Sequence, residues 1–266
     1  MFQDEDTRKF FLYAIGTGFF VILMACITLT CLLPGNEQNC LFNFFTAEPV
    51  VYEYSEPPEY KLKDNVDYRA TIKTSKGDIV INLFEENAPN TVNNFVFLSE
   101  NKYYEDVRIH RVFKDLLFQT GSRLSLDKDP SNDGLGGPGY FIEDEVNWDS
   151  LDFSRKKREE LSAMGYSSAI GLESKRMQRY SVAMANEQRG NTNGSQFFIV
   201  TAQSGDTRLR ALEGMHTVFG EVIAGFDVVE EINNTKVDTK DPDMPYPRKT
   251  IKINEITVQQ ISRVAN

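Results

Sequence analysis

The chain has few of the residues that bind metal ions or form disulfide bonds. Its 266 residues include only three cysteines and two histidines. These are too few for a disulfide-built scaffold or for a closed Cys/His zinc site. We therefore predict no metal and no cofactor, and a chemistry that uses few titrating groups or none.

Positive charge is also in deficit. Lys and Arg number 29 against 39 Asp and Glu, so the formal net charge is -10. Because neutralised phosphates supply most of the affinity for nucleic acid, no nucleic-acid partner is expected. The hydrophobic fraction of 41% and the charged fraction of 26% are ordinary. They exclude a wholly disordered chain and a fibrous protein.

One apolar, uncharged segment lies near the N-terminus, at residues 10–33. At about 1.5 Å per residue, a helix of this length exceeds the roughly 30 Å hydrocarbon core of a membrane. Arg8 and Lys9 precede it, and basic residues favour the cytoplasmic side. The pattern predicts a single-pass membrane protein with residues 1–9 in the cytoplasm and residues 10–33 in the lipid bilayer. The remainder would lie outside the cytoplasm, on the periplasmic or extracellular side.

Other interpretations of this segment remain open. The run from Leu23 to Cys26 looks like a bacterial lipoprotein cleavage site, with Cys26 as the lipidated residue. The segment could also be a cleaved signal peptide or a buried helix. Signal peptides have an apolar core of only about 7 to 15 residues and a small-residue cleavage site. The length of the segment therefore favours an uncleaved anchor.

The rest of the chain divides by composition. Residues 34–66 are acidic and contain four prolines. Such a segment repels itself and extends, which predicts a linker, although its tyrosines at positions 52, 54 and 60 could instead pack on a domain. A folded domain is predicted over residues 67–259, with a short tail at 260–266.

The predicted domain consists of short strands separated by turns. A helix begins at Pro89, with Val92, Phe95 and Leu98 on its apolar face, and a second helix covers residues 226–232. Strand-like runs occur at residues 70–74, 79–84, 107–113, 181–184, 196–201, 217–222 and 251–256. Many short strands with two helices predict a mainly β fold, a closed barrel with helices plugging its ends.

Three segments carry sequence motifs that are more specific than periodicity. The first is I-H-R-V-F at residues 109–113, followed by F-Q-T-G at 118–121. The second is M-A-N at 184–186 with N-T-N-G-S-Q-F-F-I at 191–199, and the third is L-E-G-M-H-T-V-F-G at 212–220. Together they resemble the cyclophilins, a family of peptidyl-prolyl cis-trans isomerases. The resemblance covers roughly residues 67–259 and implies a closed antiparallel eight-stranded barrel with two capping helices.

The resemblance implies a role for each matching position. The two positions expected to be catalytic are Arg111, which corresponds to the catalytic arginine, and Gln119, which corresponds to the glutamine beneath the substrate. The substrate-binding positions, which hold the peptide backbone or the proline ring, correspond to Leu116, Leu117, Ala185, Asn186, Gln196, Phe198, Leu212 and His216.

These residue types suit rotation about an X-Pro bond. Amide resonance gives a rotation barrier of about 18–20 kcal/mol, and no bond is made or broken, so neither a nucleophile nor a metal is needed. The twisted amide regains a lone pair on its nitrogen. Arg111 carries a permanent charge and a rigid fork of donors that can hydrogen-bond to that nitrogen. Such an interaction acts on the transition state more than on the ground state.

The chain departs from the family pattern at several positions. Leu116 and Leu117 stand where the pocket usually has phenylalanine and methionine. Ala211 stands where many members have tryptophan, so strong cyclosporin binding is not expected. The loop after Asn186, residues 187–190, is one residue longer than usual and borders the proline site.

The largest departure is an insertion at about residues 148–178. Asp149 or Ser150 can cap a helix that runs to Met164, with Gly165 as its stop. Similar insertions, and the preceding G-G-P-G-Y run, occur in bacterial-type cyclophilins. The basic residues of this helix could contact an acidic partner or lipid headgroups, but a solvated helix face is the simpler interpretation.

Two functions of different classes are compatible with the sequence. The first is a membrane-anchored prolyl isomerase that assists protein folding outside the cytoplasm, acting on proline-containing peptides and unfolded protein clients. The alternative is a non-catalytic module that binds proline peptides or serves as a scaffold. Retention of Arg111 favours the enzyme.

Overall fold

The computed structural model describes residues 52–127 and 129–263. The predicted cytoplasmic segment and membrane anchor, Cys26 and most of the predicted linker lie outside these residues. A compact unit begins at Tyr52 and contains every element described below.

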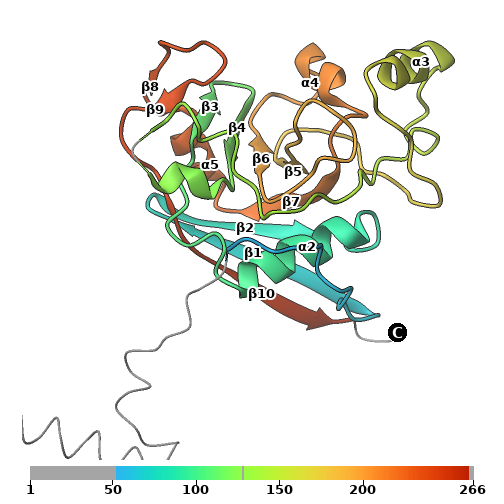
Figure 1. Ribbon diagram of the computed structural model, residues 1–266, viewed down its shortest axis with the longest axis horizontal. Coiled ribbons are helices and arrows are strands. Elements are labelled where there is room, and N and C mark those ends of the chain that lie inside the picture. The colour runs from blue at the N-terminus through green and yellow to red at the C-terminus, as the bar shows by residue number, and fades with distance from the viewer. Residues whose placement is uncertain (1–51, 128, 264–266) are drawn as a thin grey trace, which may run out of the picture. The chain divides into compact units, whose positions relative to one another are not determined.

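One antiparallel sheet of eight strands forms the body of the domain (Figure 1). Its order is β10-β1-β2-β7-β5-β6-β4-β3. Its strands are β1 (Val66–Thr74), β2 (Gly77–Leu83), β3 (Arg111–Phe113), β4 (Leu117–Thr120), β5 (Ser181–Met184), β6 (Phe197–Val200), β7 (Val218–Ala224) and β10 (Ile253–Ser262). A separate hairpin pairs β8 (Val237–Asp238) with β9 (Tyr246–Pro247). The predicted mainly β fold is confirmed.

The closure predicted for the barrel is wrong. Within the described residues the strand ladder ends at β10 on one side and at β3 on the other. A single bridge, Arg108 to Lys252, joins the segments that flank these two strands. The reason lies at the outer edge of β3, where the Val112 amide donates to the Pro245 carbonyl at 2.8 Å. The segment before β9 thus occupies the edge that a closing ladder would need.

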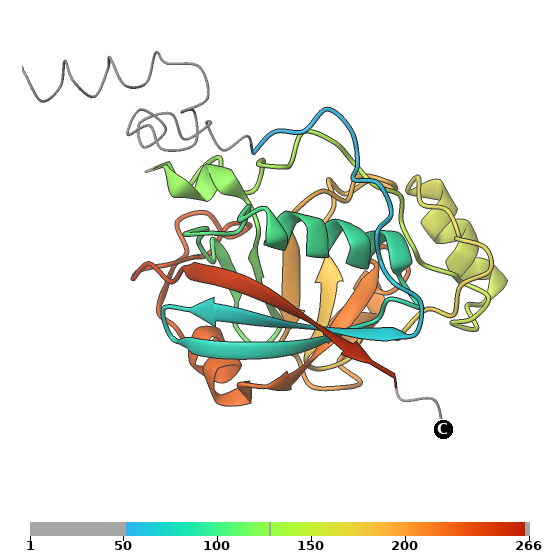
Figure 2. The same cartoon turned by 90° about the horizontal axis from the view of Figure 1, so that it is seen from below.

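Two of the helices are those that the sequence predicted. Helix α2 (Pro89–Glu100) has proline in its first turn and packs against β10, as Figure 2 shows. Helix α5 (Phe226–Asn233) packs against β2, β3 and β4. A short helix α4 (Thr207–Leu212), capped by Asp206, and a 3-10 turn η3 (Arg123–Leu126) were not predicted. Their few residues are too short for a periodic pattern to stand out.

No helix in the described part of the chain is long and apolar enough to cross a membrane. The longest, α2, has 12 residues. At about 1.5 Å per residue it extends about 18 Å, well short of the roughly 30 Å hydrocarbon core.

Buried apolar side chains form three separate clusters. The main core lies between β1, β2, β10 and the helices α2 and α5, with Phe95, Phe197 and Phe219 in mutual edge or tilted contact at 5.3 to 6.3 Å. We call the second group the pocket cluster: Leu117, Met177, Ala183, Phe198, Val200, Ala202, Leu209 and Val218. We call the third group the insert cluster: Val146, Trp148, Leu151, Leu161 and Tyr166, with Phe153 and Met215 packed on it.

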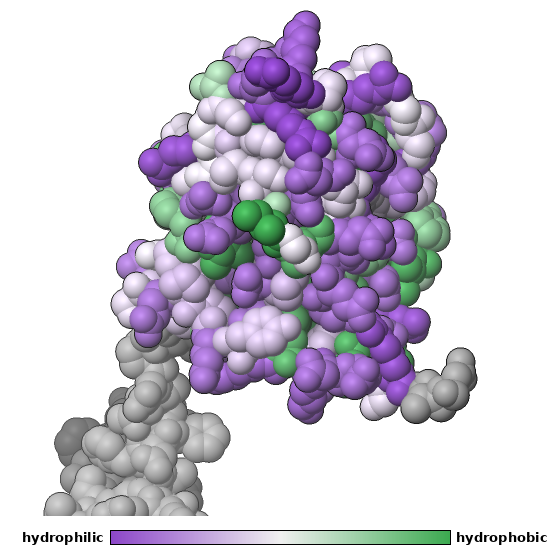
Figure 3. Space-filling view, turned by 90° about the vertical axis from the view of Figure 1, so that its right-hand side faces the viewer, coloured by the Kyte–Doolittle hydropathy of each residue, from purple (hydrophilic) through white to green (hydrophobic). Residues whose placement is uncertain are grey.

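The predicted insertion carries helix α3 (Arg155–Ala163), which begins later than expected. Ser154, not Asp149 or Ser150, caps it, because the Ser154 hydroxyl accepts from the Lys157 amide. Before Ser154 the chain instead turns its apolar side chains into the insert cluster. The face of the molecule that carries α3 is mostly hydrophilic (Figure 3), so the basic residues of α3 belong to a solvated surface.

The segment before β1 lies on the domain. Tyr52 and Tyr54 pack against the main core, and the Tyr54 amide donates to the Pro138 carbonyl at 2.8 Å. Tyr60, in contrast, is 53% exposed. Two of the three tyrosines therefore pack on the domain.

Candidate active site

A row of three polar side chains crosses three adjacent positions of the sheet. Arg111 in β3 lies directly opposite Gln119 in β4. The Arg111 Nη1 group donates to Gln119 Oε1 at 3.2 Å, and Gln119 Nε2 donates to Gln196 Oε1 at 2.8 Å. Each glutamine therefore uses both ends of its amide, and the row fixes the direction of the guanidinium.

A glycine-rich loop holds the far end of this row. Gln196 Nε2 donates to the carbonyls of Gly134 and Gly136, each at 2.8 Å. Because both carbonyls accept from Nε2, the Gln196 amide is oriented with Oε1 towards Gln119. Residues 134–139 also match the pattern G-x-G-x-x-G, but no helix follows them directly, so the loop lacks the geometry of a dinucleotide site.

The Arg111 guanidinium is half-buried and lies 4.5 Å from the centre of the Phe113 ring. Desolvation lowers its pKa from the usual value, and the nearby carboxylates of Asp243 and Asp241 oppose that effect. The Nε atom is buried without a hydrogen-bond partner among the described residues. The side chain thus holds a charge that one glutamine satisfies only in part, and it retains unused donors.

Phe198 of the pocket cluster contacts His216, which lies beside the cluster. Phe198 is buried, and its ring meets the His216 ring edge-on at 5.2 Å. His216 Nδ1 lies 2.9 Å from the Met184 carbonyl. Burial lowers the pKa of His216 to about 4, so the ring is neutral at pH 7. A carbonyl can only accept, so Nδ1 carries the proton.

The remaining apolar positions surround this pair. Leu117 belongs to the pocket cluster, and Leu116, Ala185 and Leu212 pack against it. Leu212 reaches the cluster because the short helix α4 ends there. Every apolar residue expected around a proline ring therefore meets in one place.

An open cavity of about 880 Å³ adjoins the pocket cluster at Ala185, which lines the cavity and packs against the cluster. Arg111, Gln119 and Gln196 line one part of it, and Ala185 and Asn186 line another. The glycine-rich loop and residues 187–188 also line it. Phe198, Leu212 and His216 do not line this cavity. The predicted site residues thus form two adjoining parts, one polar and one apolar.

Clusters of metal ligands are absent from residues 52–127 and 129–263. These residues contain no group of three His, Cys, Asp or Glu side chains that could hold a metal ion.

Comparison with known protein families matches this architecture. The model of the family described as "Cyclophilin type peptidyl-prolyl cis-trans isomerase/CLD" matches residues 69–258. The chain belongs to the cyclophilin family. The predicted membership of the cyclophilin-type peptidyl-prolyl cis-trans isomerases is confirmed by this match and by the names of the relatives.

Relatives of this cyclophilin include larger proteins. "Peptidyl-prolyl cis-trans isomerase cyp15" of Rhizopus delemar is 33% identical over 223 residues, which cover 84% of this chain and 29% of the relative. "Peptidylprolyl isomerase domain and WD repeat-containing protein 1" of Mus musculus is 34% identical over 218 residues, covering 81% of this chain and 28% of the relative. The chain therefore spans less than a third of the length of these relatives.

Solved structures share the fold. A cyclophilin type peptidyl-prolyl cis-trans isomerase of Cryptosporidium parvum has a TM-score of 0.53 and 26% identity, and covers 73% of this chain and 98% of its own. A structure of the same protein in the presence of the dipeptide Ala-Pro has a TM-score of 0.52 and 27% identity, over 72% of this chain and 98% of that one.

The localisation predicted from the sequence requires correction. The relatives named here, including one from Schizosaccharomyces pombe, are eukaryotic proteins, so they give no support to a periplasmic isomerase or to the bacterial type. The described residues also contain no helix able to span a membrane. The assignment as a single-pass membrane protein with an extracytoplasmic domain was wrong. It relied on hydropathy and flanking charge alone, within residues that the structure does not describe.

Some contributors to the site were missed at the level of sequence. Met177, at the end of the insertion, belongs to the pocket cluster. Phe113 stacks on the arginine, and Gly134 and Gly136 hold Gln196. The G-G-P-G-Y run gave a signal for the loop, but no local pattern marks a carbonyl that accepts from a side chain 60 residues away.

Proposed function

We propose that this cyclophilin catalyses cis-trans isomerisation of X-Pro bonds in peptides and unfolded chains. The observation that carries the proposal is the arginine beside the apolar cluster. Arg111 is held by Gln119 on one side, retains unused donors, and lines a cavity that adjoins the pocket cluster. The solved relative studied in the presence of Ala-Pro supports proline peptides as the class of substrate.

In the proposed mechanism the guanidinium acts on the twisted amide. The planar amide nitrogen has no free lone pair, whereas the pyramidal nitrogen of the transition state can accept a hydrogen bond. Arg111 donates to it and so binds the transition state more strongly than the substrate. A preference of about 2 kcal/mol for the twisted state would accelerate exchange roughly thirtyfold. The partly desolvated position of Arg111 strengthens this interaction, because fewer waters compete for the donors.

The other site residues would hold the two sides of the bond. The apolar group around Phe198 takes the proline ring, with Leu116, Leu117, Leu212 and His216 as its walls. Gln119, Gln196, Ala185 and Asn186 hold the peptide on the side of the open cavity. Because these contacts keep one side of the amide fixed, only the other side rotates.

Two departures from the family pattern bear on ligands. Ala211 is exposed and leaves open the position that tryptophan fills in many members, so we expect weak cyclosporin binding. Leu116 and Leu117 keep the pocket apolar with little change in volume, so proline binding is expected to persist.

A coupled assay on an X-Pro peptide series tests this function. The wild-type chain should accelerate isomerisation, and Arg111→Ala should lose most of that acceleration. Binding of the same peptides, followed by NMR titration, provides the second measurement. A wild-type chain that binds proline peptides without accelerating any of them would be a binding module, and the proposal would be wrong.

A further inference from the structure

The insertion supports both loops that border the proposed site. The insert cluster lies beneath the loop 186–191 on one side and beneath residues 213–216 on the other. These two loops carry Asn186 and His216. An insertion that only decorated the surface would leave them without this support.

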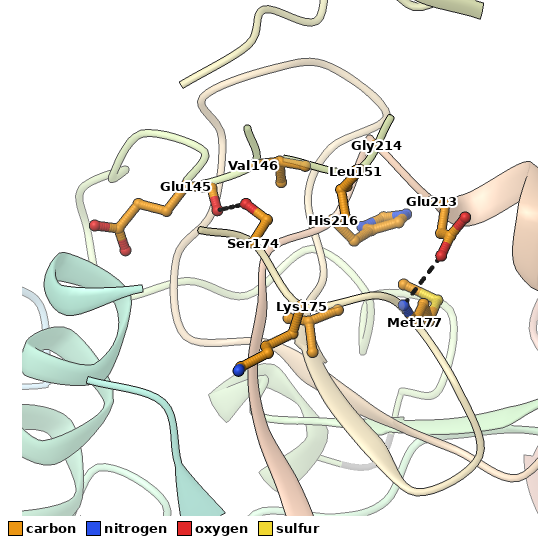
Figure 4. Close-up of a pocket in the computed structure, with 10 residues that line it drawn as sticks. Glu145, Val146, Leu151, Ser174, Lys175, Met177, Glu213, Gly214 and His216 are labelled. Atoms are coloured by element: carbon orange, nitrogen blue, oxygen red, sulfur yellow. Dashed lines mark hydrogen bonds between the residues drawn. The ribbon is translucent and has the colours of Figure 1, made fainter. Parts of the chain in front are cut away.

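Packing between the insertion and the second loop is close. Gly214 has a φ of +93°, and a Cβ there would lie 2.6 Å from Leu161 Cδ1 and from Phe153 Cε2. The Trp148 indole donates to the Gly214 carbonyl at 3.1 Å. Figure 4 shows the neighbouring contact, in which the Met177 amide points to the Glu213 carboxylate beside His216. The position of residues 213–216 is therefore set by the insertion.

The first loop meets the insertion through its backbone. A Cβ at Gly190 would lie 2.7 Å from the Gly165 carbonyl, so the backbone of this loop directly contacts the backbone of the insertion. The Asn191 amide donates to Asp144 Oδ2 at 2.8 Å, which holds the far end of the loop. Its near end is held through the side chain of Asn186.

Every polar atom of the Asn186 amide has a partner. Its Nδ2 group donates to the Met215 carbonyl at 2.7 Å. Its Oδ1 atom accepts from the Gln188 amide at 3.1 Å and from the Tyr166 hydroxyl at 3.3 Å. Tyr166 is 6% exposed and comes from the insertion. Its pKa is raised, first by burial and then by Asp144, so the hydroxyl remains a donor at neutral pH.

We propose that Tyr166 is a positioning residue that holds Asn186 in the orientation needed to bind the peptide, and that the insertion thereby tunes substrate affinity. This inference rests on the proposed function, because it takes Asn186 to contact the peptide. Tyr166 itself does not line the open cavity and so acts through Asn186. The orientation of Asn186 matters equally in the planar and twisted states of the substrate, so the effect falls on KM rather than on kcat.

A double-mutant cycle tests the proposal on the full chain. Tyr166→Phe removes one hydroxyl and keeps the packed ring. The loss of one neutral hydrogen bond should raise KM roughly two- to twelvefold with kcat nearly unchanged. In the Asn186→Ala background, Tyr166→Phe should have no further effect on KM, because the amide oxygen that accepts from the Tyr166 hydroxyl is already absent. Tyr68→Phe is the matched control, since it removes a buried hydroxyl that accepts from the Lys63 amide in another part of the fold.

The outcomes separate this inference from the proposed function. A KM increase of the same size in both backgrounds, or no increase in either, would overturn the role of Tyr166. A kcat loss accompanied by a lower melting temperature would show a structural role instead. An inactive wild-type chain would overturn the proposed function. The same cycle, measured as peptide Kd by NMR titration, would then decide the role of Tyr166.

Discussion

Arg111 and Gln119 occupy directly paired positions of β3 and β4, and the guanidinium donates to the glutamine carbonyl oxygen at 3.2 Å. Side chains at paired positions of an antiparallel ladder lie on the same face of the sheet. The ladder register therefore brings together two residues that are eight positions apart in the chain. A shift of one residue would place them on opposite faces.

Replacement of this arginine should remove most of the activity. We expect Arg111→Ala to lower kcat/KM for an X-Pro peptide at least tenfold, because the donor to the twisted amide is lost. Arg111→Lys should also be impaired, since an ammonium lacks the planar fork. A coupled isomerisation assay gives the rates. Arg69→Ala, at an exposed position of β1, serves as the control and should behave as wild type. Full activity of Arg111→Ala with an unchanged melt would refute the mechanism.

Loss of Gln119 should weaken catalysis without abolishing it. Gln119→Ala removes the partner of Arg111 and the link to Gln196, but the guanidinium itself remains. A hydrogen bond to a charged group is worth about 1.5–3 kcal/mol, and because this one acts on catalysis only by orienting the guanidinium, we expect a smaller effect, a roughly three- to tenfold fall in kcat/KM. The measurement is the same assay, with the exposed Gln203→Ala as control. A loss as large as that of Arg111→Ala would contradict this supporting role of Gln119.

Truncation of the pocket phenylalanine should affect both binding and stability. Phe198 is 3% exposed, and a buried Phe→Ala change costs about 3–5 kcal/mol. We expect Phe198→Ala to lower the melting temperature and to raise KM, since the proline ring loses one wall of its pocket. Thermal melts and saturation kinetics at a temperature well below the transition separate the two effects. An unchanged KM in the folded variant would place the proline ring elsewhere.

The buried histidine next to Arg111 should make stability depend on pH. His110 is 2% exposed, and burial lowers its pKa from 6.5 to about 4. Between these values the unfolded chain binds a proton at His110 that the folded chain does not. The free energy of unfolding therefore falls as the pH is lowered through this range.

A variant isolates this contribution from the other titrating groups. His110→Leu cannot bind the proton, whereas carboxylates titrate alike in both proteins. The stability of wild type minus that of the variant should be constant above about pH 6.5 and should decline as the pH falls towards 4. Urea unfolding at several pH values measures the difference. If the difference in stability between wild type and variant does not change with pH, the pKa of His110 is not lowered in the folded protein.

The sequence predicted the strands best where apolar and polar residues alternate, as in β1 and β2. It missed β4, whose sequence Leu-Phe-Gln-Thr shows neither alternation nor a continuous apolar run, whereas the equally buried β5 and β6 are mostly or wholly apolar. The start of α3 was placed too early for a related reason. Residues before Ser154 include a capping serine, but Leu151 and Phe153 are drawn into the insert cluster. Local capping signals do not report tertiary burial.

The amino-acid sequence by itself determined the family, the order of its motifs and the residue types at the candidate site. These properties reside in linear spacing, which a sequence carries in full. Only the tertiary structure decided that the sheet stays open at β3, that two glycine carbonyls hold Gln196, and that Tyr166 of the insertion reaches Asn186. Each of these depends on contacts between segments far apart in the chain. Such contacts are fixed by packing and hydrogen-bond satisfaction, which no local pattern encodes.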